Sequence, residues 1–409
     1  MQHRYEKHTA QFIGTPRRAW YAGGKPDRVQ SIADMRARTH RLMPRFVLEY
    51  LEGGAGQEAS LSRDCDAYAA WRFVPRFLRD VSHRSASGTL LGQESRLPLA
   101  IAPTGLNGLY MLGADSALAR AAARFGVPFI QSTMSNEPME DIARIPGLRH
   151  WWQLYVFGGE EIWTALTDRA ECAGCEALVL TVNAQLFGMR EWDRRQRGPM
   201  GLPRPLSMLN AARHPRWAIS AMRAGMPTFP NVIDFIPKNN RSFFESASWI
   251  RSQMPLSLNW DDVARIRDRW KRPLLIKGLL HPDDIRAARN SGADGVILGT
   301  HGGRQSDWSI GALDALPEAR TILGADKALY VAGGVRRGSD ILKAMALGAD
   351  GVLTGRAALY GLCAYGESGV RKALDVLEDE ILNELGQIGV EKLVNISRDS
   401  LRPAAAISA

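Results

Sequence analysis

The chain of 409 residues is predicted to fold as an α/β protein, a (β/α)8 or TIM barrel, and two observations support this. From residue 98 onward, short apolar runs that end in Gly, Pro, Thr or Asn alternate with amphipathic stretches, as in repeated βα units on a parallel sheet. In addition, "DIRAARNSGADGVILG" (284–299) and "DILKAMALGADGVLTG" (340–355) match each other, and each combines a helix, a Gly-Ala-Asp-Gly turn and a strand. A barrel consists of such repeated units, whereas a doubly wound sheet does not need them.

The elements follow in order along the chain. Residues 1–97 form an N-terminal lead that packs on the barrel, with a helical pattern over Ile32–Leu51 that ends at Gly53-Gly54. Residues 98–390 form the barrel, and 391–409 form a C-terminal tail. The eight predicted strands are 98–103, 128–132, 150–155, 177–182, 273–277, 295–298, 328–332 and 351–354.

One interval is too long for a single βα connection, so we expect residues 184–260 to form an excursion over the barrel mouth after strand four. The chain re-enters the barrel at Asn259, the predicted N-cap of the next helix. Between Arg190 and Arg223 the excursion has eight arginines against two acids. A solvated loop and a contact with anionic lipid both explain this charge. Nucleic acid is not an expected partner, because no nucleic-acid module accompanies the basic stretch.

The composition, 45% apolar and 23% charged, is typical of a globular enzyme. No apolar run is long enough for a membrane span or a signal peptide, so we expect a cytoplasmic protein, with peripheral contact at the inner face of the membrane as an option. Four cysteines are too few for a disulfide scaffold in a chain this long. Cys172 and Cys175 have metal-ligand spacing but no second pair, so no metal site is predicted.

The active site of a TIM barrel lies at the C-terminal ends of its strands. A histidine after a strand is by itself more often a turn residue, and a lysine ending a strand is usually snorkelling to solvent. Here, however, five cationic groups meet at one mouth and would repel each other unless anions bind there. The glycines beside Arg336 and Arg356 suit a phosphate, and Arg190 with Arg304 suits a carboxylate. The residues at or just after the strand ends are, in strand order, Pro103-Thr104-Gly105, Ser132, Gln153 and Tyr155, Thr181 with Asn183 and Arg190, Lys277, His301 with Arg304, Gly333-Gly334 with Arg336, and Gly355-Arg356.

An ordered set of motifs resembles the FMN-dependent α-hydroxy-acid dehydrogenase/oxidase family, which includes L-lactate dehydrogenase, mandelate dehydrogenase and glycolate oxidase. The resemblance covers about residues 30–400. The motifs are "LMPRFVLEYLEGGA", "LAIAPTGLNG", "QSTMSN", "WWQLYV", "LTVNAQLFGMRE", "LLIKG", "GADGVILGTHGGRQ" and "GGVRRGSDILKAMALGADGVLTGRA".

The resemblance implies that FMN lies across the barrel mouth and that an L-2-hydroxy acid is oxidised to the 2-oxo acid. His301 would be the general base on the substrate hydroxyl, and the flavin would accept the hydride. Lys277 would lie at the N1/C2 edge of the flavin, where a cation stabilises the charge that develops on reduction. Arg190, Arg304, Tyr50 and Tyr155 would orient the substrate. The remaining cofactor contacts implied are Pro103, Thr104, Gly105, Ser132, Gln153 and Thr181 for the isoalloxazine, and Gly334, Arg336, Gly355 and Arg356 for the phosphate.

The same resemblance bears on the partners. Gly105 follows Pro-Thr as in mandelate dehydrogenase, where glycolate oxidase has Ala, which favours electron transfer to a quinone or carrier protein over oxygen. The stretch "HPRWAI" (214–219) resembles a region of membrane-associated lactate dehydrogenases. A homotetramer is the expected assembly.

Four positions depart from the family pattern. Asn183 replaces an aspartate that hydrogen-bonds the catalytic histidine; an amide cannot stabilise the imidazolium by charge and can favour the wrong tautomer. Ala332 replaces an aspartate that binds the FMN ribityl chain, Gly299-Thr300 replaces Ser-Asn, and Met134 replaces an aromatic residue. Three explanations stay open: an altered pH profile, a specialised oxidase or oxidative decarboxylase of a biosynthetic pathway acting on an unusual substrate, and a non-catalytic FMN-binding relative.

Overall fold

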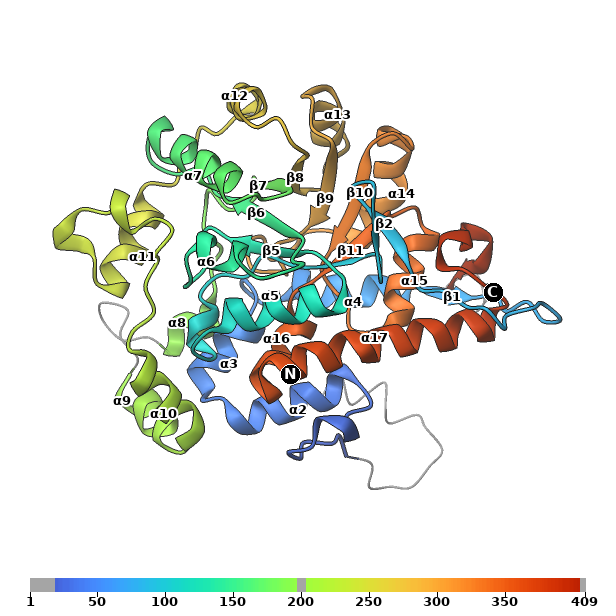
Figure 1. The fold of residues 1–409 in the computed structure, drawn as a ribbon, viewed down its shortest axis with the longest axis horizontal. Coiled ribbons are helices and arrows are strands. Elements are labelled where there is room, and N and C mark those ends of the chain that lie inside the picture. Colours follow the sequence, from blue (N-terminus) through green and yellow to red (C-terminus); the bar gives the residue numbers. More distant parts are fainter. Residues whose placement is uncertain (1–18, 197–203, 405–409) are drawn as a thin grey trace.

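A closed barrel of eight parallel strands forms the centre of the computed structural model, which describes residues 19–196 and 204–404 (Figure 1). Each strand pairs with the next along the chain, and β11 closes the ring against β4 with Val352 opposite Leu99. The predicted barrel and its eight strands are confirmed. The strands are β4 (Leu99–Ile101), β5 (Phe129–Ser132), β6 (His150–Leu154), β7 (Ala177–Thr181), β8 (Leu274–Leu279), β9 (Gly295–Gly299), β10 (Ala328–Ala332) and β11 (Gly351–Thr354).

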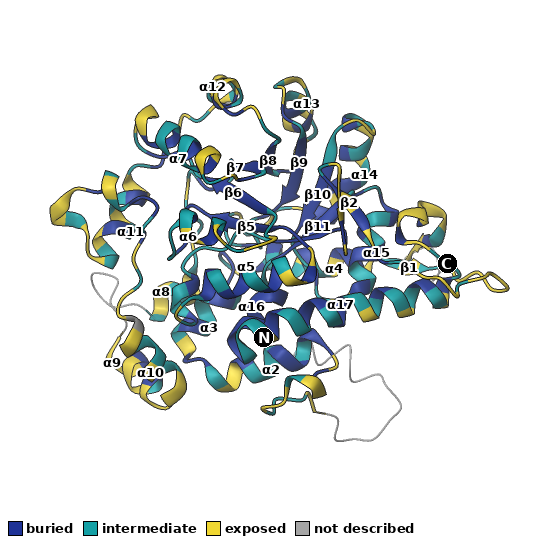
Figure 2. Cartoon of the chain, viewed as in Figure 1, coloured by how far each residue is buried: buried dark blue, intermediate teal, exposed yellow. Residues whose placement is uncertain are grey.

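The strands are buried on both faces, because side chains fill the barrel interior and helices cover its outside (Figure 2). Trp151, Ile297 and Tyr330 belong to the interior cluster. A hairpin of β2 (Gly88–Leu90) and β3 (Gln93–Ser95) covers the N-terminal end: Leu90 joins this cluster, and the N–H of Leu91 donates to Tyr330 Oη at 3.1 Å. Space for a ligand is therefore found at the C-terminal ends of the strands.

The helices that connect the strands, and the two that follow the last strand, bury apolar faces against the outside of the barrel. The last helix, α17, runs along it beside α5 and α16 (Figure 1). These helices are α5 (Ala114–Phe125), α6 (Met139–Ala143), α7 (Glu160–Cys172), α12 (Trp260–Arg269), α13 (Pro282–Asn290), α14 (Ala312–Leu323), α15 (Gly338–Ala346), α16 (Arg356–Tyr365) and α17 (Glu367–Ile388).

The N-terminal lead contains α2 (Ile32–Leu42), α3 (Arg45–Glu52), α4 (Ala59–Ala69) and β1 (Trp71–Phe73). The prediction of a single helix over Ile32–Leu51 is wrong. The first helix ends at Leu42, because the backbone of Met43 is extended, with φ −99° and ψ 139°. Pro44 causes the break, since a residue before proline is driven out of the helical region. Pro44 then becomes the N-cap of α3.

The C-terminal segment returns to the lead. Its strand β12 (Leu401–Pro403) pairs antiparallel with β1, with Arg402 opposite Arg72. The described parts of the N-terminal lead and of the C-terminal segment are thus joined by a small sheet outside the barrel.

The excursion after β7 contains α8 (Glu191–Gln196), α9 (Pro205–Ala212), α10 (Pro215–Ala224) and α11 (Phe243–Ser252), and it projects from one side of the barrel (Figure 1). It ends at α12. The predicted N-cap is confirmed: Asn259 Oδ1 accepts from the N–H groups of Asp261 and Asp262 at 2.8 and 3.3 Å. Within the described residues, no helix is long and apolar enough to cross a membrane, and no cluster of metal-ligating side chains occurs.

Candidate active site

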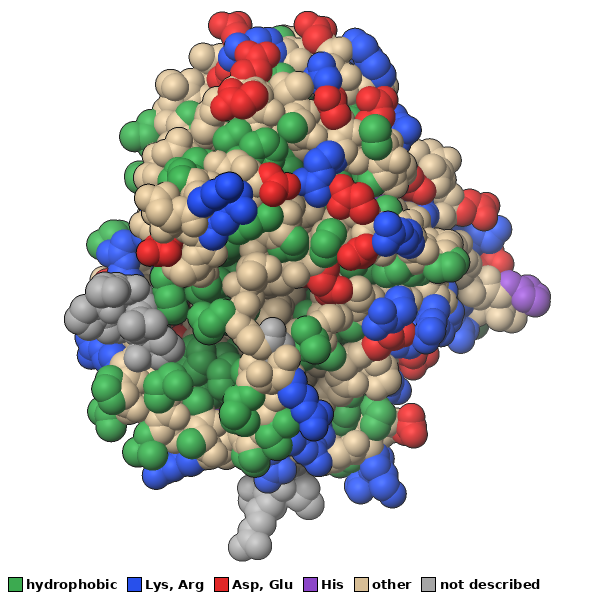
Figure 3. All heavy atoms as spheres, turned by 60° about the vertical axis from the view of Figure 1, so that its left-hand side comes forward, with side chains coloured by type: hydrophobic (Ala, Val, Ile, Leu, Met, Phe, Trp, Pro, Cys, Tyr) green, Lys and Arg blue, Asp and Glu red, His purple; other side chains and the backbone are tan. Residues whose placement is uncertain are grey.

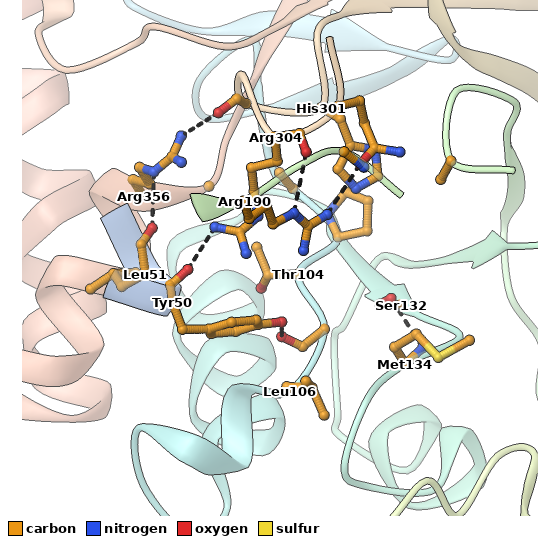
Figure 4. Close-up of a pocket in the computed structure, with 18 of the residues that line it drawn as sticks. Tyr50, Leu51, Thr104, Leu106, Ser132, Met134, Arg190, His301, Arg304 and Arg356 are labelled. Atoms are coloured by element: carbon orange, nitrogen blue, oxygen red, sulfur yellow. Dashed lines mark hydrogen bonds between the residues drawn. The ribbon is translucent and has the colours of Figure 1, made fainter. Parts of the chain in front are cut away.

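A cavity of about 470 Å³ opens at the C-terminal ends of the strands, and most of the predicted site residues line it (Figure 4). Three lie behind the lining: Gln153 accepts from Ser132 Oγ at 2.9 Å, Asn183 contacts His301, and buried Thr181 pairs in register with Lys277. The predicted residues that line the cavity are Tyr50, Pro103, Thr104, Gly105, Ser132, Tyr155, Arg190, Lys277, His301, Arg304, Gly334, Arg336, Gly355 and Arg356.

His301 follows β9 in a left-handed backbone conformation, with φ +60°. Its Nδ1 lies 3.1 Å from Asn183 Oδ1, and its Nε2 lies 3.3 Å from Tyr155 Oη. The Tyr155 ring is stacked at 23° to the imidazole. Two neighbours therefore hold the imidazole, one at each nitrogen.

The orientation of the Asn183 amide determines the histidine tautomer. Asn183 Nδ2 donates to the backbone carbonyl of Gly299 at 3.0 Å, and a carbonyl can only accept. The amide oxygen must then face His301, so Nδ1 carries the proton and Nε2 has the free lone pair. The amide thus selects the tautomer with a free lone pair at Nε2, so an asparagine at position 183 does not impose the other tautomer.

Burial lowers the pKa of His301 well below its usual value, and the cations Lys277, Arg190, Arg304 and Arg356 lower it further. The imidazole is therefore neutral at pH 7 and able to accept a proton. Burial also raises the pKa of Tyr155, so its hydroxyl stays protonated and donates to Nε2.

Arg190 and Arg304 face the same part of the cavity as His301 (Figure 4). Arg304 Nη1 donates to the carbonyls of Tyr50 and Gly53 at 2.6 and 2.9 Å, and its guanidinium lies 4.9 Å from the centre of the Tyr50 ring. Its Nη2 is buried without a hydrogen-bond partner among the described residues. Arg190 Nε donates to the Arg304 carbonyl at 3.2 Å. The pair provides buried positive charge and an available donor, which suits a carboxylate.

Lys277 lies within β8, just before a register shift in the strand; it is 6% exposed, and burial lowers its pKa to about 8. It is therefore largely protonated at pH 7, and a negative charge that develops beside it would be stabilised.

The other end of the cavity is lined by Gly334, Arg336, Gly355 and Arg356. Gly334 has φ +76°, and a Cβ there would meet the backbone carbonyl oxygen of Asp64 at 2.0 Å, so only glycine fits. Gly355 is the N-cap of α16, whose first N–H groups have no partner within the helix. Arg356 Nε and Nη1 donate to the carbonyls of Leu51 and Gly302 at 3.0 and 2.9 Å, so this guanidinium also ties α3 to the loop after β9.

An apolar wall of the cavity lies beyond the histidine. Met134, Leu106 and Tyr110 line it together with residues of the excursion. The excursion residues of this wall are Phe187, Phe229, Ala247, Ile250 and Met254.

Three further acidic or amide side chains hold the site. Gln305 accepts from Arg190 Nη2 at 3.2 Å and donates to the Asn183 carbonyl at 2.9 Å. Asp307 accepts from the N–H groups of Gln57 and Ala59 at 2.7 and 2.8 Å. Asp64 is buried behind the loop after β9. None had a signal stronger than a polar residue in a helix or turn.

A TIM barrel whose mouth combines a neutral histidine with five cations is typical of an enzyme that binds anionic ligands. Comparison with known proteins specifies the class. The family model described as FMN-dependent dehydrogenase matches residues 39–403. The (S)-mandelate dehydrogenase of Pseudomonas putida is 41% identical over 374 residues, which cover 91% of this chain and 93% of that protein. The L-lactate dehydrogenase of Caulobacter sp. (strain K31) is 38% identical over 376 residues, covering 91% and 98%.

The fold comparison agrees. A crystal structure of the monotopic membrane protein (S)-mandelate dehydrogenase is 40% identical, with a TM-score of 0.88, and the match covers 92% of this chain and 100% of that one. The chain belongs to the FMN-dependent dehydrogenase family. It is an FMN-dependent oxidoreductase acting on α-hydroxy acids.

The residues present fit FMN. Thr104 Oγ1, Gln153 Nε2 and Thr181 Oγ1 are buried without a hydrogen-bond partner among the described residues, and all three belong to the predicted isoalloxazine site. Buried polar groups are rarely left unpaired, so a ring with carbonyl and N–H groups along its edge is the partner they suit. Ala332 lines the cavity and supplies no polar side chain there.

Proposed function

We propose that the protein oxidises an L-2-hydroxy acid to the 2-oxo acid, with His301 as the base that removes the proton of the 2-hydroxyl. The observation that carries this proposal is the pair of contacts at the imidazole: Asn183 holds Nδ1–H, and Nε2 faces the cavity beside Tyr155 Oη. A substrate hydroxyl that replaces the Tyr155 contact would donate to Nε2 directly. FMN, when bound, takes up the two electrons that leave the substrate.

The carboxylate of the substrate is proposed to bind Arg304 and Arg190, with Tyr50 and Tyr155 beside them. The available Nη2 of Arg304 supports this, because a buried donor without a partner gains most from a charged acceptor. Burial lowers the pKa of Arg304, and the neighbouring charge of Arg190 lowers it further, a repulsion that a bound anion relieves.

The apolar wall favours a substrate with a large side chain, aromatic or long aliphatic, over lactate or glycolate. Phe229, Ile250 and Met254 of the excursion face the same cavity as Met134 and Leu106. A methyl group would leave much of this surface without contact, and each additional buried methylene stabilises a complex by about 0.8 kcal/mol.

The electron acceptor is proposed to be a quinone or carrier protein at a membrane, and the protein to be cytoplasmic and peripheral at the inner face. Helices α9 and α10 support this, since hydrophobic side chains gather on the face that carries them (Figure 3). The exposed residues are Leu206, Met208, Leu209, Ile219 and Met222, and Arg204, Arg213, Arg216 and Arg223 lie among them. Apolar residues mixed with arginines are typical of helices that lie on an anionic bilayer. Residues 197–203 of the basic stretch lie outside the described part of the chain.

The experiment is anaerobic bleaching of the bound flavin with lactate, glycolate, mandelate and larger aryl or aliphatic 2-hydroxy acids. We expect mandelate or a larger substrate to bleach it fastest. Absence of flavin from the purified protein contradicts FMN binding, and a preference for glycolate contradicts the proposed pocket.

A specialised flavoenzyme is the second candidate, favoured by the amide at position 183. Without a carboxylate on Nδ1, the imidazolium formed during oxidation has less stabilisation, which suits a substrate whose hydroxyl is unusually acidic. Flavin that stays yellow with every simple 2-hydroxy acid, in a protein that still binds a substrate-like carboxylate, favours this candidate.

A further inference from the structure

The N-terminal lead places a buried carboxylate directly behind the histidine loop. Asp64, on α4, is 2% exposed. It accepts from the hydroxyl of Thr300 and, through Oδ1, from the N–H of Ala312 at 3.2 Å. Thr300 Oγ1 in turn accepts from the N–H of Gly303 at 3.0 Å. Asp64 is thus linked, through one side chain, to both ends of the His301 loop.

The loop needs such support, because three successive residues adopt the left-handed conformation. His301, Gly302 and Gly303 have φ values of +60°, +66° and +72°. A left-handed backbone is unfavourable for the non-glycine His301, so the conformation persists only when neighbours enforce it. The Thr300–Gly303 bond spans these three residues, and Asp64 anchors Thr300 from outside the barrel.

The same helix contacts the turn at the predicted phosphate end. A Cβ at Gly333 would lie 2.6 Å from Asp64 Oδ2, and Tyr68, one turn further along α4, donates to the Gly333 carbonyl at 3.1 Å. One face of α4 therefore packs against the loops after β9 and β10, which carry His301 and Arg336.

Asp64 also faces most of the charges of the site. The positive charges of Arg336, after β10, and Arg356, on α16, act to lower the pKa of Asp64. The charge of Asp64 in turn raises the pKa values of Lys277, Cys65 and Tyr68, and Asp340 of α15 also raises those of Cys65 and Tyr68. Burial raises the pKa of Asp64 to about 6, so it is ionised at pH 7 and above. Burial lowers the pKa of Lys277, and Asp64 is the charge that opposes this effect.

We infer that Asp64 is a positioning residue of the site: through its hydrogen bond to Thr300 it holds the His301 loop in its left-handed conformation. The inference rests on the proposed role of His301 as the base. It gives the N-terminal lead a function in catalysis, because α4 supplies the buried carboxylate that holds this loop.

The first test measures the rate of anaerobic flavin reduction, with FMN content determined on the same samples, in the wild type, in Asp64→Asn and in the control Asp66→Asn, which removes the same charge from the exposed face of α4. The asparagine has one acceptor oxygen for two donors, the Thr300 hydroxyl and the Ala312 N–H. Reduction by Asp64→Asn is expected to be at least tenfold slower while FMN stays bound, and Asp66→Asn is expected to keep the wild-type rate. An unchanged rate in a folded, FMN-loaded Asp64→Asn protein overturns the positioning role.

The second test separates this inference from the proposed function. His301→Ala should abolish rapid flavin reduction; if it does not, His301 is not the base, and the proposed function fails rather than the role of Asp64.

Two variants of Thr300 test the loop independently, including the case in which Asp64→Asn does not fold. Thr300→Val removes the hydroxyl at nearly constant volume and is expected to slow flavin reduction at least tenfold while FMN stays bound. Thr300→Ser keeps the hydroxyl and should restore most of the rate. Equal rates for Val and wild type contradict the positioning role.

Discussion

Replacing Asn183 by Asp is expected to raise the pKa of His301 by about one unit. Asn183 Oδ1 lies 3.1 Å from Nδ1, so a carboxylate in its place makes a charged hydrogen bond. Such a bond contributes about 1.5–3 kcal/mol, against about 0.5–1.5 for a neutral one. The difference of about 1–1.5 kcal/mol favours the imidazolium and corresponds to about one pH unit, since one unit equals about 1.36 kcal/mol.

Two consequences follow for the enzyme. The acid limb of flavin reduction, where His301 becomes protonated and cannot act as a base, should move to higher pH by that amount. Well above the limb, the rate should rise about tenfold, because the same carboxylate stabilises the imidazolium formed as the substrate loses its proton. There is also a cost: the Asn183–Gly299 bond of 3.0 Å is lost, and an oxygen would face the Gly299 carbonyl. We expect the free energy of unfolding to fall by about 1–3 kcal/mol.

The assay is anaerobic stopped-flow reduction of the flavin between pH 5 and 9, with Asn183→Ala as the control that removes the hydrogen bond without adding charge. The alanine variant should lose rate at every pH. An acid limb that stays in place in a folded, FMN-loaded Asn183→Asp protein would refute the reasoning, because His301 would then not be the group that titrates.

Three further predictions concern other parts of the molecule. Arg304→Lys keeps the charge but loses the forked donors, so an unreactive carboxylate should bind at least tenfold more weakly in a flavin absorbance titration; unchanged affinity would remove Arg304 from the carboxylate site. In the FMN-free protein, the folded pKa of Asp64, about 6, exceeds its usual value of about 4, so its contribution to stability is present below pH 4 and lost as pH rises through 6. Between these pH values the wild type should lose about 3 kcal/mol more unfolding free energy than Asp64→Asn, and parallel curves from chemical denaturation would contradict this. Replacing Leu206, Leu209 and Met222 by Ser should lower the affinity for anionic vesicles at least a hundredfold in a sedimentation assay. The reason is that each side chain buried in the bilayer contributes about 1.5–3 kcal/mol. The control Val394→Ser, at an exposed position in the C-terminal tail, should leave the affinity unchanged.

The barrel could be predicted because parallel strands buried on both faces are continuous apolar runs, which stand out from the amphipathic helices between them. The convergence of His301, Lys277 and the arginines followed from the geometry of a barrel, where all strand ends meet at one mouth. The lead was predicted less well. Its helical periodicity continues across Pro44, whereas in the structure the extended backbone of Met43 separates two helices, α2 and α3.

The supporting contacts could not be predicted. Asp64 and Thr300 are 236 positions apart, and a lone aspartate in a helix usually faces solvent. The tautomer of His301 depends on where the Asn183 amide donates, which only the position of the Gly299 carbonyl decides. Such contacts depend on how the lead docks on the barrel, and no local pattern encodes that docking.

The most direct measurement of the central proposal is the rate of anaerobic flavin reduction by a 2-hydroxy acid in His301→Ala, with FMN content and binding of an unreactive carboxylate measured on the same sample. General base catalysis contributes about 10²–10⁴-fold, so the rate should fall by at least a hundredfold while FMN and carboxylate binding are retained. Reduction at the wild-type rate would show that His301 is not the base and contradict the proposed mechanism.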